Sequence, residues 1–230
     1  MQYTKQTISI IQSYCAQKPG AYEARPFGPT TICYKVMGKI FAQLNSEERF
    51  FRMTLKCDPD QAYFYRSIYP GVVVRGYHCP PVQQPYWNTI DLDAFEDMQI
   101  LFQMMDEAYE AVVRKLKKKE QVQFLALTQF EYRDTDGADS DFVLLCERVD
   151  SIHDAIVVYK DNEPVACGAF QLYDEERAEI KHIYVSPSLG GIGLEEEIIR
   201  RLEAKAKMKG FRRCIIETEA PLETVCKRYN

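Results

Sequence analysis

The chain has 230 residues, of which 46% are hydrophobic and 27% charged, and its formal net charge is −5. These values are typical of a soluble globular protein with one large or two small domains, and no apolar run approaches the roughly 20 residues that span a membrane. The acidic balance does not by itself indicate a nucleic-acid-binding protein. The first residues, MQYTKQTISII, lack the apolar core and cleavage site of a signal peptide, so we expect a cytoplasmic location.

The eight cysteines and three histidines are the residues most able to hold a metal or form disulfides. No two cysteines form a CxxC pair, and none has zinc-ligand spacing with a histidine. We therefore predict no metal site and expect reduced, mostly buried thiols. The cysteines are residues 15, 33, 57, 79, 146, 167, 214 and 226.

The first half of the chain predicts helices and strands in an order typical of an α+β domain with antiparallel strands. A helix over about 4–17 ends before Pro19-Gly20, and TICYKVMGKIFAQL predicts a hairpin that turns at Met37-Gly38-Lys39. Pro59 opens a second helix, for which Asp58 is the expected N-cap. Further strands are predicted over FFRMTLKCD, GVVVRGY and WNTIDL.

A long helical pattern, FEDMQILFQMMDEAYEAVVRKL, runs into the lysine-rich stretch RKLKKKEQ. Its apolar side chains recur at helical spacing, and lysines at the C-terminal end suit the helix dipole. After the lysines, we interpret QVQFLALTQFEY as the start of a new, β-leaning segment. We therefore expect two domains, 1–119 and 120–230.

The first half resembles the MmcQ/YjbR family over nearly all of residues 1–118. The resemblance is carried by PGAYEARPFGPTTICYKVMGKIFAQL, LKCDPDQA, YPGVVVRGYH and YWNTIDLD, in that order. It implies a CyaY-like α+β sandwich, and members of the family are often labelled DNA-binding. The family usually carries basic residues and a histidine before the position of Trp87, whereas this chain has the uncharged segment CPPVQQPYW. Because phosphate contacts need lysine or arginine, this departure weighs against DNA binding.

Two groups of side chains in this half have alternative interpretations. Basic residues alternate along the predicted strands, and we interpret them as one solvated face of a sheet. Several aromatic residues near Trp87 form either a stacking surface or part of the core. The basic residues are Lys35, Lys39, Arg52, Lys56 and Arg75, and the aromatic group is Trp87, Tyr86, Tyr77 and His78.

The second half predicts the order helix, three strands, helix, strand, helix. FVLLCERVDSI is the first helix, and AIVVYKDNEPVACGAFQLY forms two strands around a turn at Asp161–Pro164. The third strand, AEIKHIYVSP, follows the turn Asp174–Glu176 and leads into a glycine loop. A helix from about Leu194 to Lys209 ends at Gly210, and RRCIIETEA and PLETVCKRY complete the order.

This half resembles the GNAT acetyltransferase superfamily over about 122–230. The resemblance is carried by EPVACGAFQL, AEIKHIYVSP, the GGIG loop with its helix, KGFRRCIIET and PLETVCKRYN. It implies a mixed-sheet fold that binds acetyl-CoA, with the loop on the pyrophosphate. It also implies that the strand residues Ile183, Tyr184 and Val185 offer backbone groups to the pantetheine arm.

The physical basis for such a loop is the free backbone N–H groups at a helix N-terminus, which glycine lets an anion approach closely. The residues concerned are Gly190, Gly191, Ile192, Gly193, Leu194 and Glu195. The superfamily pattern is Gln or Arg, two variable residues, Gly, one variable residue, then Gly or Ala. Here Gly190 stands at the first position and Glu195 at the last, so both depart from the pattern. Either Glu195–Glu197 only favour the helix N-terminus and the loop has lost its ligand, or the amides of Gly191 to Leu194 still bind it more weakly.

The resemblance also suggests catalytic residues. A carboxylate on the strand before the loop acts as a base toward an amine, and Glu179 is the candidate, with Glu217 as a second choice. The alternative interpretation is that Glu179 and Glu217 are solvated strand residues without a catalytic role. Tyr229 in KRYN matches the tyrosine that protonates the leaving thiolate.

Superfamily members normally continue past KRYN with a turn and a further strand pair, whereas this sequence stops at Asn230. We therefore expect a GNAT-like domain that lacks its last strand pair, either as a truncated product, as half of a homodimer that completes the sheet, or as a degenerate remnant. The expected function is acetyl-CoA-dependent N-acetyl transfer to a small amine or a protein amine, with the first domain as a recognition module. The alternative is a non-catalytic regulatory or DNA-binding protein on a degenerate GNAT-like scaffold.

Overall fold

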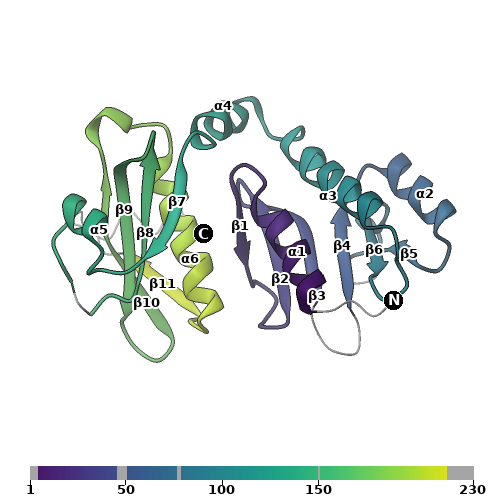
Figure 1. The fold of residues 1–230 in the computed structure, drawn as a ribbon, viewed down its shortest axis with the longest axis horizontal. Helices are drawn as coiled ribbons and strands as arrows, with labels where there is room; N and C mark the ends of the chain where they lie inside the picture. Colours follow the sequence, from purple (N-terminus) through teal and green to yellow (C-terminus); the bar gives the residue numbers. More distant parts are fainter. Residues whose placement is uncertain (1–4, 46–50, 77–78, 150, 217–230) are drawn as a thin grey trace. The chain divides into compact units, whose positions relative to one another are not determined.

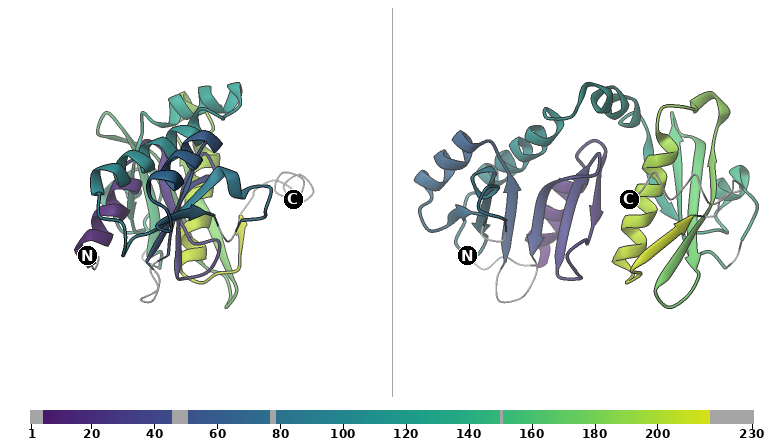
Figure 2. Two further views of the ribbon diagram at one scale, coloured as in Figure 1. Left: turned by 90° about the vertical axis from the view of Figure 1, so that its right-hand side faces the viewer. Right: turned by 180° about the vertical axis from the view of Figure 1, so that it is seen from behind.

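The computed structural model describes residues 5–45, 51–76, 79–149 and 151–216. The chain divides into two compact units, Met1–Thr128 and Gln129–Asn230, and each is described by itself (Figures 1 and 2). The division falls a few residues after the expected boundary of 119/120, so that the helix α4 (Lys118–Leu127) lies in the first unit.

The first unit is an α+β structure with a six-stranded antiparallel sheet in the order β1-β2-β3-β4-β6-β5. Its strands are β1 (Ala21–Ala24), β2 (Thr31–Val36), β3 (Lys39–Asn45), β4 (Arg52–Lys56), β5 (Val73–Arg75) and β6 (Trp87–Asp91). Besides α4, its helices are α1 (Lys5–Ala16), α2 (Pro59–Ile68), α3 (Met98–Val113) and the short 3-10 turn η1 (Gln84–Tyr86). The α+β class and the antiparallel strands predicted for this half are confirmed.

The β2–β3 hairpin turns where the sequence predicts it. Met37 and Gly38 have positive φ angles of 48° and 76°, as a two-residue hairpin turn requires. Helices α1 and α3 pack against the sheet, because Ile11 and Met105 belong to the same buried cluster as Phe41. Asp58 takes the N-cap position of α2, but its side chain makes no capping hydrogen bond and instead pairs with Arg114 and Lys115.

The predicted strand over QVQFLAL is wrong, since this segment forms the helix α4. A carboxylate oxygen of Glu120 accepts a hydrogen bond from the backbone N–H of Lys117 at 2.7 Å, which caps the helix start. Phe124 and Leu127, one turn apart, are both buried, and Phe124 joins the core of the first unit. A short apolar run fits either periodicity, and here the cap and the tertiary contact favour the helix.

The second unit contains the five-stranded mixed sheet β11-β10-β9-β8-β7, in which β10 and β11 are parallel and the other pairs antiparallel. Its strands are β7 (Glu131–Thr135), β8 (Asp154–Lys160), β9 (Glu163–Leu172), β10 (Arg177–Val185) and β11 (Arg213–Ile216). Its helices are α5 (Ser140–Leu145), the 3-10 turn η2 (Pro187–Leu189) and α6 (Leu194–Met208). The mixed-sheet class is confirmed, while the last predicted helix lies outside the described residues.

Two details of this unit differ from the prediction. The first helix is short, ending at Leu145 rather than continuing through FVLLCERVDSI. The β8–β9 hairpin turns on two residues, Asp161 and Asn162, with φ of 52° and 68°, so Glu163 and Pro164 already belong to β9. The polar pair Asp-Asn tolerates this left-handed conformation better than other side chains do.

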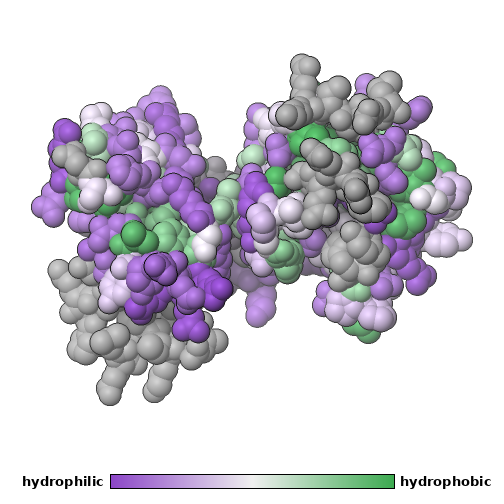
Figure 3. Space-filling view, turned by 90° about the horizontal axis from the view of Figure 1, so that it is seen from below, coloured by the Kyte–Doolittle hydropathy of each residue, from purple (hydrophilic) through white to green (hydrophobic). Residues whose placement is uncertain are grey.

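Both units keep most large apolar side chains inside. On the face drawn in Figure 3, hydrophilic residues predominate and hydrophobic residues form smaller patches. Among the described residues, no helix has the length and apolar character needed to cross a membrane.

Helices α5 and α6 cover opposite faces of the second sheet (Figures 1 and 2). On the α5 side, Phe142 packs with Val157 and Ala169. On the α6 side, Ile198 and Leu202 are completely buried. The helix lies close to the sheet at Gly168 in β9, where an added Cβ would be 2.6 Å from Ile198 Cγ2 and 3.0 Å from Leu202 Cδ1. The absence of a side chain at Gly168 therefore determines how closely α6 approaches.

We predict that Gly168→Ala destabilises the second unit by about 1–3 kcal/mol, because the methyl group forces α6 away from β9. Faster amide hydrogen exchange in β9 and α6 would measure this loss. Trp87, the chain's single tryptophan, lies in the first unit, so its fluorescence transition in urea should not move. Gly190→Ala is the matched control, since its added Cβ would meet nothing closer than Pro187 O at 3.5 Å. Equal exchange in the two variants would contradict the prediction.

Candidate functional site

A β-bulge interrupts β10 just before the predicted binding loop. The pairing of β10 with β9 shifts register between Lys181 and Tyr184. His182, between them, has a φ of 53°, an uncommon left-handed conformation for a residue with a side chain. The carbonyl oxygen of His182 accepts hydrogen bonds from the thiols of Cys146 and Cys167 at 3.5 and 3.7 Å.

The bulge decides which way the following residues point. The register places Tyr184 opposite Cys167, and Tyr184 packs with the cluster on the α5 side of the sheet. Ile183 turns to the α6 side, where its Cγ1 would be 3.6 Å from a Cβ at Gly168. Ile183, Tyr184 and Val185 are all half-buried. The sequence contains no signal for this bulge, because the glycine-free stretch KHIYV looks like an uninterrupted strand.

The loop between β10 and α6 has the strand–glycine–helix geometry that the sequence predicts. After η2, Gly190 has an ordinary φ of −60°, whereas Gly191 and Gly193 have φ of 80° and 82°. An added Cβ at Gly191 would meet no atom within 4 Å, so the backbone is open to approach there. The two left-handed glycines let the chain turn directly into the helix.

The start of α6 presents several unused backbone donors. The N–H of Gly190 bonds Pro187 O at 3.3 Å, and the next such donor is Glu197, whose N–H bonds Gly193 O at 3.2 Å. Between them, the N–H groups of residues 191–196 donate to no other residue that the structure describes. Free amides at a helix N-terminus, together with the helix dipole, favour an anion.

The three glutamates that open α6 have different environments. Glu195 and Glu196 are exposed, whereas Glu197 is 2% exposed. The Glu197 carboxylate pairs with Arg200, and it accepts a hydrogen bond from Arg201 Nε at 2.9 Å. The guanidinium of Arg201 also lies 3.9 Å from the ring centroid of Tyr132 on β7. Glu197 therefore forms ion pairs within α6 that stabilise the helix. Glu195 and Glu196 are the carboxylates that are exposed to solvent at its start.

Glu179, the candidate base, lies on the α5 side of the sheet, the same side as Tyr184. Its carboxylate accepts a hydrogen bond from Gln171 Nε2 at 3.1 Å and pairs with Lys181 Nζ at 3.3 Å. The side chains of Glu179 and Lys181 are 19% and 18% exposed, so this is a half-buried ion pair. The other two candidates, Glu217 and Tyr229, lie outside the described residues.

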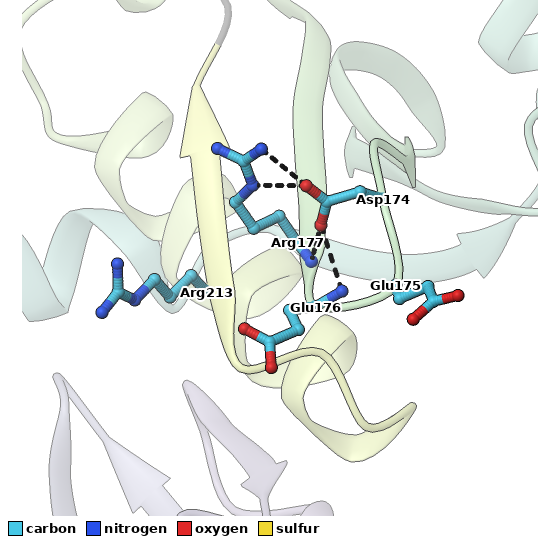
Figure 4. Close-up of a pocket in the computed structure, with 5 residues that line it drawn as sticks. All are labelled: Asp174, Glu175, Glu176, Arg177 and Arg213. Atoms are coloured by element: carbon cyan, nitrogen blue, oxygen red, sulfur yellow. Dashed lines mark hydrogen bonds and ion pairs between the residues drawn. The ribbon is translucent and has the colours of Figure 1, made fainter.

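A surface pocket lies at the opposite end of the sheet from the loop, at the β9–β10 turn (Figure 4). Its lining side chains are charged, but they largely pair with one another or with neighbours. Arg177 pairs with Asp174, which lowers the pKa of that exposed carboxyl, and Arg212 pairs with Glu176. Charges that pair with one another in this way stabilise a turn and leave few groups to bind a ligand. We therefore place the candidate site at the glycine loop.

In the first unit, the structure separates the aromatic residues near Trp87. Trp87 is 8% exposed and belongs to the interior, whereas Tyr86 is 39% exposed. The ammonium groups of Lys56 and Lys115 lie 5.2 and 5.7 Å from the Tyr86 ring centroid. Burial lowers the pKa of Lys56, and the charge of Lys115 acts in the same direction. Tyr77 and His78 lie outside the described residues.

Two family models match the chain, one after the other. The YjbR family matches residues 16–111, and the acetyltransferase (GNAT) family matches residues 110–230. The uncharacterized protein YbdF of Escherichia coli O157:H7 is 31% identical over 97 residues, which are 42% of this chain and 75% of that protein. The uncharacterized protein YjbR of Escherichia coli K12 is 27% identical over 114 residues, 49% of this chain and 92% of that protein.

Solved structures are similar to each half. The Deinococcus radiodurans protein DR2400 is 25% identical with a TM-score of 0.46, over 51% of this chain and 86% of its own. A GNAT family acetyltransferase from Elizabethkingia anophelis, with acetyl-CoA bound, is 21% identical with a TM-score of 0.34, over 39% of this chain and 65% of its own.

We predict that Glu197→Ala costs about 1–3 kcal/mol of stability, because it leaves the Arg200 and Arg201 guanidinium groups without their carboxylate. Glu196→Ala removes the same charge from the adjacent, exposed position and should change stability by less than about 0.5 kcal/mol. Calorimetric melting of the two variants beside the wild type measures the difference. If both variants melt alike, Glu197 does not have the structural role assigned to it.

Proposed function

The chain belongs to the acetyltransferase (GNAT) family and carries a YjbR domain before its GNAT domain, and from this premise we propose that it transfers an acetyl group from acetyl-CoA to the nitrogen of a small amine or a protein amine. The observation that carries the proposal is the row of unused amides at 191–196, at the start of α6 and just after the β10 bulge. A strand, a glycine turn and a helix N-terminus in this order can bind a pyrophosphate through the backbone alone.

The backbone of the loop fits such an anion. The left-handed Gly191 and Gly193 turn the chain into α6, and Gly191 leaves room for close approach. Gly190 contributes no polar side chain, and the exposed carboxylate of Glu195 lies in the first helical turn. In this proposal the amides of Gly191 to Leu194 hold the pyrophosphate, and Glu195 weakens the binding without abolishing it.

Bound acetyl-CoA would supply a thioester whose acetyl carbon an amine nitrogen can attack. Such an amine must be neutral, and a nearby carboxylate can accept its proton, directly or through water. Glu179 is the proposed base, held in a fixed orientation by Gln171 and Lys181. Ile183, Tyr184 and Val185 would offer backbone groups to the pantetheine arm. The resemblance assigns the acid for the leaving thiolate to Tyr229.

For the first unit we propose a recognition role toward the acceptor or a protein partner. Its helix α2 exposes Tyr63 at 72%, Phe64 at 55% and Ile68 at 49%. Large apolar side chains that cluster on one exposed helix are typical of contact surfaces. The pair Lys56 and Lys115 beside Tyr86 adds positive charge elsewhere on this unit.

A non-catalytic role, in which the GNAT domain is only a scaffold, is the second candidate. Two observations favour it: Glu195 places negative charge beside the anion site, and Glu179 is already paired with Lys181. If the role is DNA binding, the basic residues around Tyr86 would contact phosphates, and affinity should then fall steeply with salt.

We predict that isothermal titration with acetyl-CoA gives a micromolar dissociation constant for the wild type and tighter binding for Glu195→Ala. Removing one like charge a few ångströms from the pyrophosphate is worth about 1 kcal/mol, or roughly fivefold in affinity. Glu175→Ala is the matched control, because it removes an exposed carboxylate at the opposite end of the sheet and should leave affinity unchanged.

The pattern of results separates the two candidates. Binding by the wild type leads to an assay of amine acceptors, with Glu179→Gln expected to lower kcat more than it raises KM. Binding by Glu195→Ala but not by the wild type would mean that Glu195 has switched the site off. If neither binds, the acetyltransferase proposal fails, and a salt titration of DNA binding tests the other.

A further inference from the structure

Two cysteine thiols from distant parts of the second unit meet beside the β10 bulge. Cys146 lies at the C-terminal end of α5 and Cys167 in β9, and their sulfur atoms are 3.3 Å apart. Both thiols also approach the carbonyl oxygen of His182, at 3.5 and 3.7 Å. The two sulfurs and this single carbonyl form one small cluster on the α5 side of the sheet.

The two thiols are not equivalent. Cys167 is completely buried, whereas Cys146 is half-buried and so accessible to a small oxidant. The hydrogen bond between the two sulfur atoms lowers the pKa of Cys146, although burial and Glu147 act against this. The same hydrogen bond and burial raise the pKa of Cys167. Because Cys146 is the thiol that an oxidant can reach, we assign it as the attacking thiol and the buried Cys167 as the resolving thiol.

We propose that Cys146 and Cys167 are a reversible oxidation site, and that disulfide formation between them alters the β10 bulge at His182. A disulfide has a sulfur–sulfur distance of about 2.05 Å, so closing the present 3.3 Å gap draws α5 and β9 together. Both sulfurs lose their protons on oxidation, so His182 loses both thiol donors. The bulge is thereby deprived of the hydrogen bonds that the thiols now provide.

The chemistry balances with a peroxide as the oxidant. The Cys146 thiolate attacks one oxygen of hydrogen peroxide, breaking the O–O bond to form a sulfenic acid and hydroxide. The Cys167 sulfur then attacks the sulfenic sulfur and forms the disulfide, and the sulfenic oxygen leaves as water. Two thiols are oxidised and one peroxide is reduced to two waters, and a small dithiol reverses the step.

Peptide mapping of the full chain tests the modification directly. The protein is treated with hydrogen peroxide, alkylated with N-ethylmaleimide, digested with trypsin and analysed without reduction. Arg148 and Lys160 separate the two cysteines, so the expected product is a cross-linked peptide pair that dithiothreitol releases. Cys79 and Cys214 are matched half-buried control thiols and should be alkylated completely. Alkylation of Cys146 and Cys167 as complete as that of the controls would overturn the proposal.

Two variants make the assignment specific. Cys167→Ser should let Cys146 oxidise to a sulfenic acid, which dimedone labels, without a cross-link. Cys146→Ser should abolish both the cross-link and the label. A cross-link that pairs either cysteine with a different partner would overturn the assignment, and the wild-type map decides the matter if a variant fails to fold.

Amide hydrogen exchange measures the effect on the bulge. Residues 181–185 should exchange at least threefold faster or slower in the oxidised chain than in the reduced chain, with β1–β3 of the first unit unchanged. A disulfide without such a change would overturn the link to the bulge. The expected further effect, at least a threefold change in acetyl-CoA affinity, rests on the proposed function. If the reduced chain binds no acetyl-CoA, the proposed function fails, while the mapping and exchange results still decide the thiol proposal.

Discussion

The close packing of α6 on β9 at Gly168 is the constraint on which the candidate site depends. Ile198 and Leu202 of α6 occupy the space that a side chain at Gly168 would need, and Ile183 of β10 lies against the same point. One contact thus joins the helix, the central strand and a residue of the bulge. Since β10 and α6 are both held there, the short segment between them has its two ends fixed.

At this loop the backbone amides favour a bound anion and the carboxylate of Glu195 opposes it. The net effect on anion affinity depends on the size of the two free-energy contributions. A hydrogen bond from an amide to a charged group contributes about 1.5–3 kcal/mol, and the loop has several unused amides. A single exposed carboxylate nearby costs about 1 kcal/mol. Glu197 adds little to this repulsion, because Arg200 and Arg201 neutralise it inside the unit. On these magnitudes, Glu195 would weaken the proposed anion binding without abolishing it.

Features with a local chemical signature could be predicted from the sequence, and features set by contacts between distant residues could not. The turn at Met37-Gly38 and the helix ending at Gly210 follow from glycine conformation, and both are confirmed. The segment QVQFLAL was predicted as a strand because its helical cap and its contact with the first core are not visible in a short apolar run.

Within the candidate site, the glycine loop could be predicted and its surroundings could not. The pattern GGIG before a helix is a local signal. By contrast, Glu195 and Glu197 look alike in the sequence, and only the positions of Arg200 and Arg201 distinguish them. Cys146 and Cys167 are 21 residues apart, and it is sheet pairing and the placement of α5 that bring their sulfurs together. The register shift at His182 likewise depends on how β10 pairs with β9, which a local sequence pattern does not reveal.

Three consecutive residues of the bulge contact three different parts of the unit. Lys181 pairs with Glu179, the proposed base, His182 accepts hydrogen bonds from the two thiols, and Ile183 packs at Gly168 beneath α6. Because these residues are adjacent, a change of backbone angles at His182 must be absorbed by its neighbours on both sides. A disulfide at Cys146 and Cys167 would therefore act on the base and on the helix N-terminus through the backbone, without contacting either.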